Sequence, residues 1–269
     1  AAGAAPAGFV VMSSRASYEL VRKCARLDIA LLATVSAPTS LAIDLAQRGQ
    51  RVVVLDNDHK LSIGSRAICF AKRTLEIWDR LGVGQRMVDK GVSWNLGKVF
   101  LKDEQLYEFN LLPEEGHERP AFINLQQYYA EAYLVDRVSA LPAIDLRWRN
   151  KVIALENRND GVELTVDTPD GPYRLHAAFV IACDGARSPL RAMLDLRMEG
   201  DSFEGRFVIA DIRVDLPLPT ERLAFFDPDW NPGNTVLMHR EPEGIWRIDY
   251  QLPPGETPEQ ALEPASMKA

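Results

Sequence analysis

The chain has 269 residues, 46% of them hydrophobic, which is enough for one large or two small domains with sizeable cores. It carries 31 basic and 38 acidic residues, and the net charge of −7 argues against nucleic acid or an anionic membrane as the main partner. No stretch approaches the ~18 apolar residues that a membrane span requires, so we expect no membrane segment.

Cysteine and histidine content argues against a metal or disulfide framework. The cysteines are Cys24, Cys69 and Cys183, and their odd number and wide spacing fit neither a disulfide scaffold nor a zinc site. The histidines are scattered without the spacing of metal ligands. We therefore expect reduced thiols, a cytoplasmic protein and no metal site.

The first residues differ from the rest of the chain. Residues 1–26 begin with a low-complexity run of small residues, so we treat them as an atypical N-terminal segment. The apolar run 29–35 has the length of a buried strand. Polar residues at 36–40 then predict a turn.

A helix and a second strand follow this turn. Leu41 and Leu45 share one face of a helix predicted at 41–48, and Gly49 stands where a helix end favours a left-handed residue. Residues 51–55 are predicted as a buried parallel strand. Strand, turn, helix and strand within about 30 residues form the βαβ unit of a nucleotide-binding sheet.

Two longer helices are predicted in the middle of the chain. The first covers 65–81 and ends at Gly82, and the second covers about 124–140. The second has an apolar stripe that we expect to face inward, made of Leu125, Tyr128, Ala132 and Val135. Short strands are expected at 99–101, 106–109, 145–148, 152–156 and 162–166. Asp160-Gly161 and Asp170-Gly171 predict hairpin turns.

The last third of the chain is predicted to be rich in strands. Residues 179–183 form a strand that leads into a loop, and Ser188-Pro189 is typical of a helix start. Strands of an antiparallel sheet are expected at 207–214, 222–226, 235–240 and 246–252. Residues 253–269 are rich in proline and glutamate and are predicted to be a disordered tail. Four aromatic residues are expected to serve packing: Trp94, Tyr128, Trp230 and Trp246.

The predicted turn at 36–40 is where a dinucleotide-binding unit carries its glycines. Those glycines allow a tight turn and a close backbone approach to the pyrophosphate. Here the turn contains Ser36, Ala37 and Pro38 and no glycine. Taken alone, it is a structural turn between a strand and a helix.

Two carboxylates follow predicted strands. Asp56 ends the second strand, where an acidic residue can accept hydrogen bonds from the ribose of adenosine; alternatively, it begins a solvated loop. Asp184 and Gly185 end the strand at 179–183, at the sheet edge where α/β proteins bind ligands. The alternative for this pair is a plain strand–turn–helix junction with Asp184 in solvent.

The run from Asp184 to Arg191, Asp-Gly-Ala-Arg-Ser-Pro-Leu-Arg, resembles the second shared motif of flavoprotein aromatic hydroxylases of the p-hydroxybenzoate hydroxylase-like group. Within that group it is most similar to the 3-(3-hydroxyphenyl)propionate hydroxylase type. The likeness covers roughly 41–252. Supporting segments lie at 41–49, 64–70, 73–77, 122–129 and 246–250.

The resemblance implies an α/β fold with a Rossmann-like FAD-binding domain at 27–204 and part of an antiparallel β substrate domain at 205–252. For the cofactor site it implies Ser36, Ala37 and Pro38 at the pyrophosphate turn, Asp56 at the ribose, Arg66 near the pyrophosphate, Gln127 or its neighbour Gln126 at the ribityl chain, and Asp184 with Gly185 between FAD and the nicotinamide nucleotide. Arg187 and Arg191 would buttress the last of these loops.

The function implied is that of an FAD-dependent monooxygenase that hydroxylates a small phenolic compound with NAD(P)H and O2. The cofactor carries this chemistry, so we nominate no catalytic acid or base. Two alternatives are an inactive, truncated remnant of the family and a non-enzymatic interaction module.

The sequence departs from the family in two respects. Ser36 and Ser40 stand where the outer glycines of the turn are expected, and the likeness does not extend to the family's second half, which carries its Gly-Asp motif. We expect the sheet beyond residue 205 to be incomplete, with an exposed edge and an exposed apolar face. Such a sheet favours homo-oligomerisation.

Overall fold

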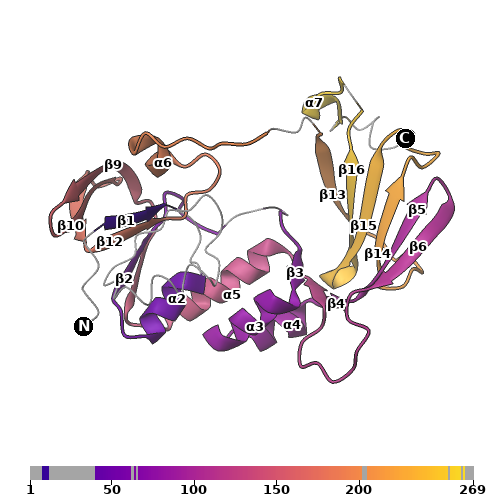
Figure 1. Cartoon of the computed structure of the whole chain (residues 1–269), viewed down its shortest axis with the longest axis horizontal. Helices are drawn as coiled ribbons and strands as arrows, with labels where there is room; N and C mark the ends of the chain where they lie inside the picture. Colours follow the sequence, from indigo (N-terminus) through magenta and orange to yellow (C-terminus); the bar gives the residue numbers. More distant parts are fainter. Residues whose placement is uncertain are drawn as a thin grey trace. The chain divides into compact units, whose positions relative to one another are not determined.

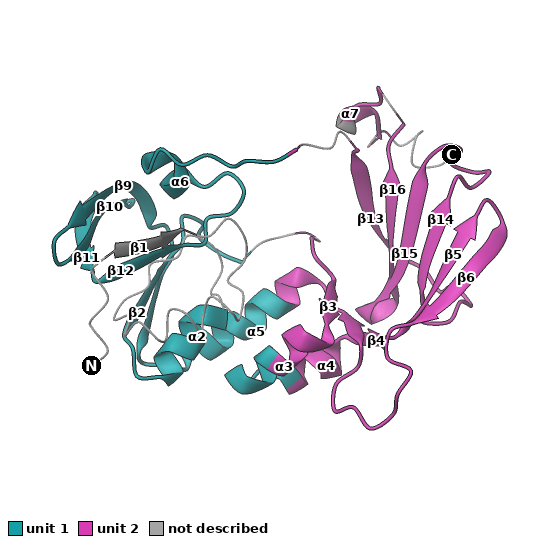
Figure 2. Ribbon diagram, viewed as in Figure 1, with its two compact units in different colours: residues 1–63, 77–84, 130–200 teal, residues 64–76, 85–129, 201–269 magenta. Residues whose placement is uncertain are grey.

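The computed structural model describes residues 8–11, 40–61, 64, 66–201, 205–253, 255–261 and 263 (Figure 1). The chain divides into two compact units that are discontinuous in sequence (Figure 2). Unit 1 comprises 1–63, 77–84 and 130–200, and unit 2 comprises 64–76, 85–129 and 201–269. The sequence suggested a single boundary near residue 204, and the functional domain limits stay a prediction.

Unit 1 contains two parallel strand pairs. Strand β1 (Gly8–Val11) pairs with β12 (Phe179–Ala182), and β2 (Val52–Leu55) pairs with β8 (Ile144–Arg147). The strand beside β12 therefore lies in the segment that we expected to be atypical. The strand predicted at 29–35 lies outside the described residues.

Helix α2 (Ser40–Gln47) covers this part of unit 1. Its Leu41 and Leu45 pack in a cluster with Val52, Val54 and Ile181, so the apolar face of the helix supplies the core. The helix ends at Gly49, whose φ of +82° suits a residue without a side chain. The predicted helix and its stop are confirmed.

A three-stranded antiparallel sheet completes unit 1. Its strands are β9 (Lys151–Arg158), β10 (Gly161–Asp167) and β11 (Tyr173–Ala177). Both predicted hairpins are present, and a side chain at Gly161 would collide with the Ala177 carbonyl. Val162, Leu164 and Val166 alternate inward and are fully buried.

Unit 2 is built on a six-stranded sheet, whose strands can be followed in Figure 1. In spatial order the strands are β13 (Phe207–Arg213), β16 (Ile245–Gln251), β15 (Thr235–Glu241), β14 (Arg222–Phe226), β5 (Leu96–Leu101) and β6 (Glu104–Asn110). Only β14 and β5 run parallel. The four strands predicted beyond residue 205 are confirmed, and the hairpin at 96–110 extends their sheet.

A second, three-stranded sheet in unit 2 corrects one helix prediction. Strands β3 (Cys69–Ala71) and β4 (Val92–Trp94) flank β7 (Phe122–Asn124). Helix α3 therefore begins at Lys72 and runs to Leu81, not from residue 65, and α4 (Gly84–Lys90) follows. The helical spacing of apolar residues before 72 was misleading because Cys69–Ala71 pair with β7, and this tertiary pairing overrides local preference.

Helix α5 (Gln127–Ser139) also differs from its prediction. Its buried positions are Ala130, Glu131, Leu134 and Val138. Of the inward stripe predicted from Leu125, Tyr128, Ala132 and Val135, only Leu125 is buried, and the other three are half-buried. The helix begins two residues after Leu125, which leaves that residue in the preceding loop and rotates the buried face.

The short helices complete the structure. Helix α6 (Pro189–Met193) has the predicted N-cap Ser188, and a 3-10 turn, η1 (Pro242–Gly244), joins β15 to β16. Helix α7 (Pro258–Ala261) lies in the segment predicted as a disordered tail, and its Ala261 is buried. The composition of the segment predicted disorder, but the burial of Ala261 stabilises this short helix, and composition does not reveal such a contact.

Of the aromatic residues expected in packing, Trp94 and Trp246 are buried and Tyr128 is half-buried. Trp230 is 57% exposed, although its ring lies edge-on to Phe225 at 5.8 Å. In the described part of the chain, no helix is long and apolar enough to cross a membrane.

Candidate functional site

Asp56 lies immediately after β2 and is 4% exposed. Its Oδ1 accepts a hydrogen bond of 2.8 Å from the backbone N–H of Asp58. Burial raises the pKa of this carboxyl, the Asp58 N–H opposes the rise, and the Asp58 and Glu131 charges add to it. The alternative of a solvated loop is wrong for Asp56, whereas the four residues after it are exposed.

The loop after β12 is closed by its own side chains. Asp184 Oδ2 accepts a hydrogen bond of 3.0 Å from the Leu190 N–H, and Ser188 Oγ accepts one of 2.9 Å from the Arg191 N–H. The Arg191 side chain donates to the Ala186 carbonyl, so it buttresses the loop as the resemblance implied. Gly185 has a φ of +78°, a conformation that side chains disfavour.

Asp184 is not the solvated residue of the plain-junction alternative. Its Oδ1 is buried and has no hydrogen-bond partner among the residues that the structure describes. A buried carboxylate oxygen without a partner is costly unless a further donor reaches it. Asp184 thus combines a helix-capping contact with one acceptor atom that remains available for a ligand.

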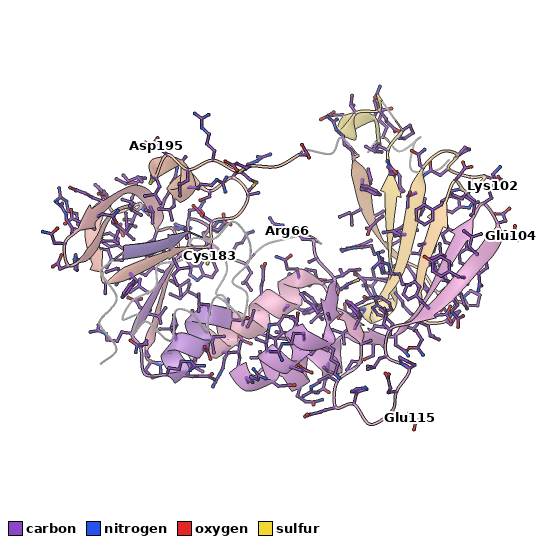
Figure 3. All side chains as sticks on the ribbon, viewed as in Figure 1. Arg66, Lys102, Glu104, Glu115, Cys183 and Asp195 are labelled. Carbon is purple, nitrogen blue, oxygen red and sulfur yellow. The ribbon has the colours of Figure 1, made fainter. Side chains whose placement is uncertain are left out.

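Gln127 and Arg66 belong to one anchored segment of unit 2. Gln127 is the first residue of α5, and its Oε1 accepts a hydrogen bond of 3.2 Å from the Ala67 N–H. The Arg66 carbonyl accepts one of 2.7 Å from Arg247 Nη1, while the Arg66 side chain is exposed (Figure 3). The backbone at residues 66 and 67 is therefore held by the buried Arg247 and by the half-buried Gln127.

The predicted pyrophosphate turn has no described geometry. Ser36, Ala37 and Pro38 lie outside the described residues, and α2 begins two residues later at Ser40. Its contact with a nucleotide stays a prediction.

A row of polar residues on one face of the large sheet, three of them buried, was missed by the sequence reasoning. Strand pairing places His239 opposite Arg247, and Arg247 opposite Asp211. Because side chains alternate along strands, Glu241 and Asp249 lie on the same face as these three. The signal in the sequence was the alternation of charged residues along two neighbouring strands.

Arg247 is the centre of this row and is 1% exposed. Its Nε lies 2.9 Å from Asp211 Oδ1 and its Nη2 lies 3.2 Å from Asp211 Oδ2, which is a bidentate ion pair. Nε also lies 3.4 Å from Glu241 Oε1. Arg222 lies on the same face, next to the Leu223–Met238 pair, and its charge acts on Asp249 and His239.

Cys69 of the small sheet contacts His239 of this row without forming a reactive pair. Cys69 Sγ donates to Asn124 Oδ1 at 3.3 Å and lies 3.9 Å from His239 Nδ1. Burial raises the pKa of the Cys69 thiol to about 11. Burial, with the charges of Arg222 and Arg247, lowers the pKa of His239 to about 3. A neutral thiol beside a neutral imidazole is neither a nucleophile nor a base at neutral pH.

Comparison with known proteins assigns the class. A sequence model of the FAD binding domain family matches residues 37–261, which is most of the chain. The chain therefore belongs to the FAD binding domain family. A model of the FdhD/NarQ family matches residues 2–55, a smaller part.

Curated relatives include flavin monooxygenases. The chain is 29% identical over 185 residues to a flavin-dependent monooxygenase of Mycobacteroides abscessus, covering 65% of this chain and 39% of the relative. It is 26% identical over 219 residues to para-nitrophenol 4-monooxygenase of a Pseudomonas strain, covering 78% and 52%. It is 23% identical over 239 residues to 3-(3-hydroxy-phenyl)propionate/3-hydroxycinnamic acid hydroxylase of Mycolicibacterium smegmatis, covering 88% and 42%. The chain thus spans about half or less of these relatives.

Solved structures show the same fold. The p-nitrophenol 4-monooxygenase PnpA of Pseudomonas putida superposes with a TM-score of 0.75 at 23% identity, covering 87% of this chain and 60% of that one. The flavin-dependent monooxygenase PieE, solved with FAD and substrate, has a TM-score of 0.75 at 20% identity, with coverages of 89% and 45%. The α/β FAD-binding fold and the partial antiparallel sheet expected from the sequence are confirmed.

FAD is the cofactor of this family, and the described residues fit it. Asp56 offers a buried carboxylate at the end of a strand, where a ribose can be held, and Asp184 offers a buried acceptor without a partner.

Proposed function

We propose that the chain forms the FAD-binding part of a monooxygenase that hydroxylates a small phenolic compound with NAD(P)H and O2. The observation that carries the proposal is the family match across both units, with Asp56 and Asp184 following strands β2 and β12. The relatives named above act on nitrophenol and on hydroxyphenylpropionate, which supports a phenolic substrate class.

The residues of this chain would bind and orient the cofactor. Asp56 would accept hydrogen bonds from the adenosine ribose, and the segment held by Gln127 would contact the ribityl chain. Asp184 would present its free oxygen toward the nicotinamide side. When bound, FAD supplies the activation of O2 and the transfer of one oxygen atom to the ring.

We also propose that the protein works in the cytoplasm and self-associates through the large sheet. Cys69 and Cys183 are free thiols, which suits a reducing compartment. Phe207, Ile209 and Phe226 are 50%, 48% and 45% exposed and lie on one face of the sheet. Exposed apolar side chains of this size favour association between copies.

The test is a titration of the purified chain with FAD, followed by flavin absorbance and fluorescence. We expect a shifted flavin spectrum and micromolar or tighter binding. The bound form should then oxidise NAD(P)H faster when a suitable phenol is added. A folded sample that binds no FAD would sink the proposal for this chain.

A further inference from the structure

In unit 2, the carboxylates of Asp211 and Glu241 share the guanidinium of the buried Arg247. The Arg247 guanidinium is already engaged by both oxygens of Asp211 and by the Arg66 carbonyl. Glu241 has only the remaining contact, 3.4 Å from Arg247 Nε. The Arg247 guanidinium therefore forms a bidentate ion pair with Asp211 and only a longer contact with Glu241.

Glu241 is the poorly paired member of this cluster. Its side chain is 0% exposed, and neither carboxylate oxygen makes a hydrogen bond within the described residues. Asp249, on the neighbouring strand and the same face, also has a buried oxygen without a partner. Burying a charged carboxylate without hydrogen bonds is costly, and taking up a proton removes that cost.

The groups that face Glu241 come from several elements and include the Cys69 thiol of β3. Arg247 and Asp249 lie on β16, and Asp211 lies on β13. Gln126 and Tyr128 approach from the start of α5. If Glu241, Asp211 and Asp249 were all ionised, three negative charges would face the two positive charges of Arg247 and the more distant Arg222. One bound proton makes the net charge of this cluster zero.

Gln126 is placed to complete a proton site. It is 1% exposed, and neither its amide oxygen nor its amide nitrogen has a hydrogen bond of ordinary geometry to a described residue. Two residues before it, Asn124 donates to the carbonyl of Arg240, the neighbour of Glu241, so the Gln126 segment packs against this end of β15. The Gln126 amide favours the ionised Glu241 carboxylate and so lowers its pKa. An amide can donate through nitrogen or accept through oxygen, so it can serve either protonation state of its neighbour.

We infer that Glu241 and Gln126 form a buried proton-binding site, in which Glu241 holds the proton and the Gln126 amide reverses its orientation when the proton leaves. The protonated acid donates to Gln126 Oε1, and the carboxylate accepts from Gln126 Nε2. No other atom is gained or lost.

The charges around the site agree with this assignment. Burial raises the pKa of Glu241 to about 7, Arg247 and Gln126 oppose the rise, and Asp211 and Asp249 add to it. The site would therefore exchange its proton near neutral pH. It does not depend on the proposed oxygenase function, although Gln126 adjoins Gln127, and Arg247 holds the Arg66 carbonyl.

The first test is carbon NMR of the full chain with labelled glutamate carboxyl groups, from about pH 4 to about pH 9. We expect one signal with a midpoint near pH 7 that is missing in Glu241→Gln. Glu243→Gln is the matched control, because the pKa of that exposed carboxyl is lowered by Lys90 and Tyr129. The control should remove a different signal and leave the neutral midpoint in place. The inference is overturned if no glutamate titrates above its ordinary range, or if the neutral signal survives in Glu241→Gln.

The pH dependence of the unfolding constant is a second measurement, which does not require resolved NMR signals. Because glutamine mimics the protonated acid, Glu241→Gln should fold, and its unfolding constant relative to that of the unmodified chain should fall more than tenfold between about pH 5 and about pH 8. A ratio independent of pH, or a variant that does not fold, would count against the site. Gln126→Met should raise the midpoint of Glu241, since the amide favours the ionised form. An unchanged midpoint would remove Gln126 from the inference.

Discussion

Trp94 Nε1 donates a 2.7 Å hydrogen bond to Asn124 Oδ1, and both residues are buried. The same amide donates through Nδ2 to the Arg240 carbonyl at 2.8 Å. Asn124 therefore ties two strands of the small sheet to β15 of the large sheet. These hydrogen bonds lie in the protein interior, where a polar group without a hydrogen-bond partner destabilises the folded state.

Asn124→Leu should lower the free energy of unfolding by about 2–4 kcal/mol, because it leaves the Trp94 indole and the Arg240 carbonyl without partners. Urea unfolding followed by tryptophan fluorescence measures this. Asn157→Leu is the control, since Asn157 lies on an exposed strand position, and we expect a change of less than about 0.5 kcal/mol. Equal effects from the two variants would contradict the role given to Asn124.

Asp56→Ala should weaken FAD binding roughly tenfold or more, because it removes a charged hydrogen-bond acceptor worth about 1.5–3 kcal/mol. Fluorescence titration with FAD gives the dissociation constants. Asp58→Asn is the control: its backbone N–H still caps Asp56, and its side chain is exposed. If Asp56→Ala binds FAD as well as the control does, the ribose role is wrong.

Cys69 should resist alkylation at neutral pH. Its pKa of about 11 leaves almost no thiolate, and the reaction should accelerate only as pH rises toward that value. Mass spectrometry after iodoacetamide treatment measures the rate, with the urea-unfolded chain as the reference for an accessible thiol. Rapid labelling of Cys69 in the folded chain would show that the thiol is ionised or exposed.

His239 and Glu241 should act in opposite directions on stability. The folded pKa of His239, about 3, lies below its unfolded value of 6.5, so its contribution is present above pH 6.5 and is lost as pH falls. Glu241, raised from 4.5 to about 7, contributes below pH 4.5 and loses its contribution as pH rises to about 7.

In the window between pH 4.5 and pH 6.5 the two slopes, each at most about 1.4 kcal/mol per pH unit, should largely cancel. His239→Asn should therefore expose a loss of stability with rising pH, and Glu241→Gln should expose the reverse. Urea unfolding of the three proteins across this window is the measurement. Parallel pH profiles would refute the opposing assignment.

Ile209→Lys should reduce self-association by placing a charge on the exposed face of β13, where Ile209 is 48% exposed. Ile153→Lys is matched in residue type and exposure, at 45%, but lies on β9 of unit 1. Analytical ultracentrifugation over a concentration series should show fewer oligomers for Ile209→Lys alone. Unchanged assembly in that variant would exclude this face.

Local patterns predicted much of the fold. The alternation and turn residues beyond residue 205 located four strands, and Gly49, Gly82 and Ser188 marked helix ends correctly. Long-range pairing was out of reach, because Cys69–Ala71 become a strand only through contact with Phe122–Asn124. The burial of Ala261 was also out of reach, because no local sequence pattern predicts it.

Of the candidate site, too, the residues recognisable from local sequence were predicted, and those that depend on distant contacts were not. Asp56 and Asp184 were identified because each follows a strand in its own segment. The cluster of Cys69, Asn124 and His239 was missed because its hydrogen-bonding atoms come from residues 55 and 170 positions apart. The register of the small sheet places Cys69 opposite Asn124, and the packing of β15 brings His239 to the Cys69 thiol.

Pairing between distant strands also constrains how the molecule is made. Strand β1 pairs with β12, and β5 pairs with β14, and in each pair the two strands are far apart in the sequence. The first strand of each pair therefore leaves the ribosome long before its partner. Neither unit can be cut out as one continuous stretch of chain. The core of unit 1 therefore closes only after β12 has been made, and that of unit 2 only after β14, and until then the apolar side chains of the earlier strands are open to aggregation.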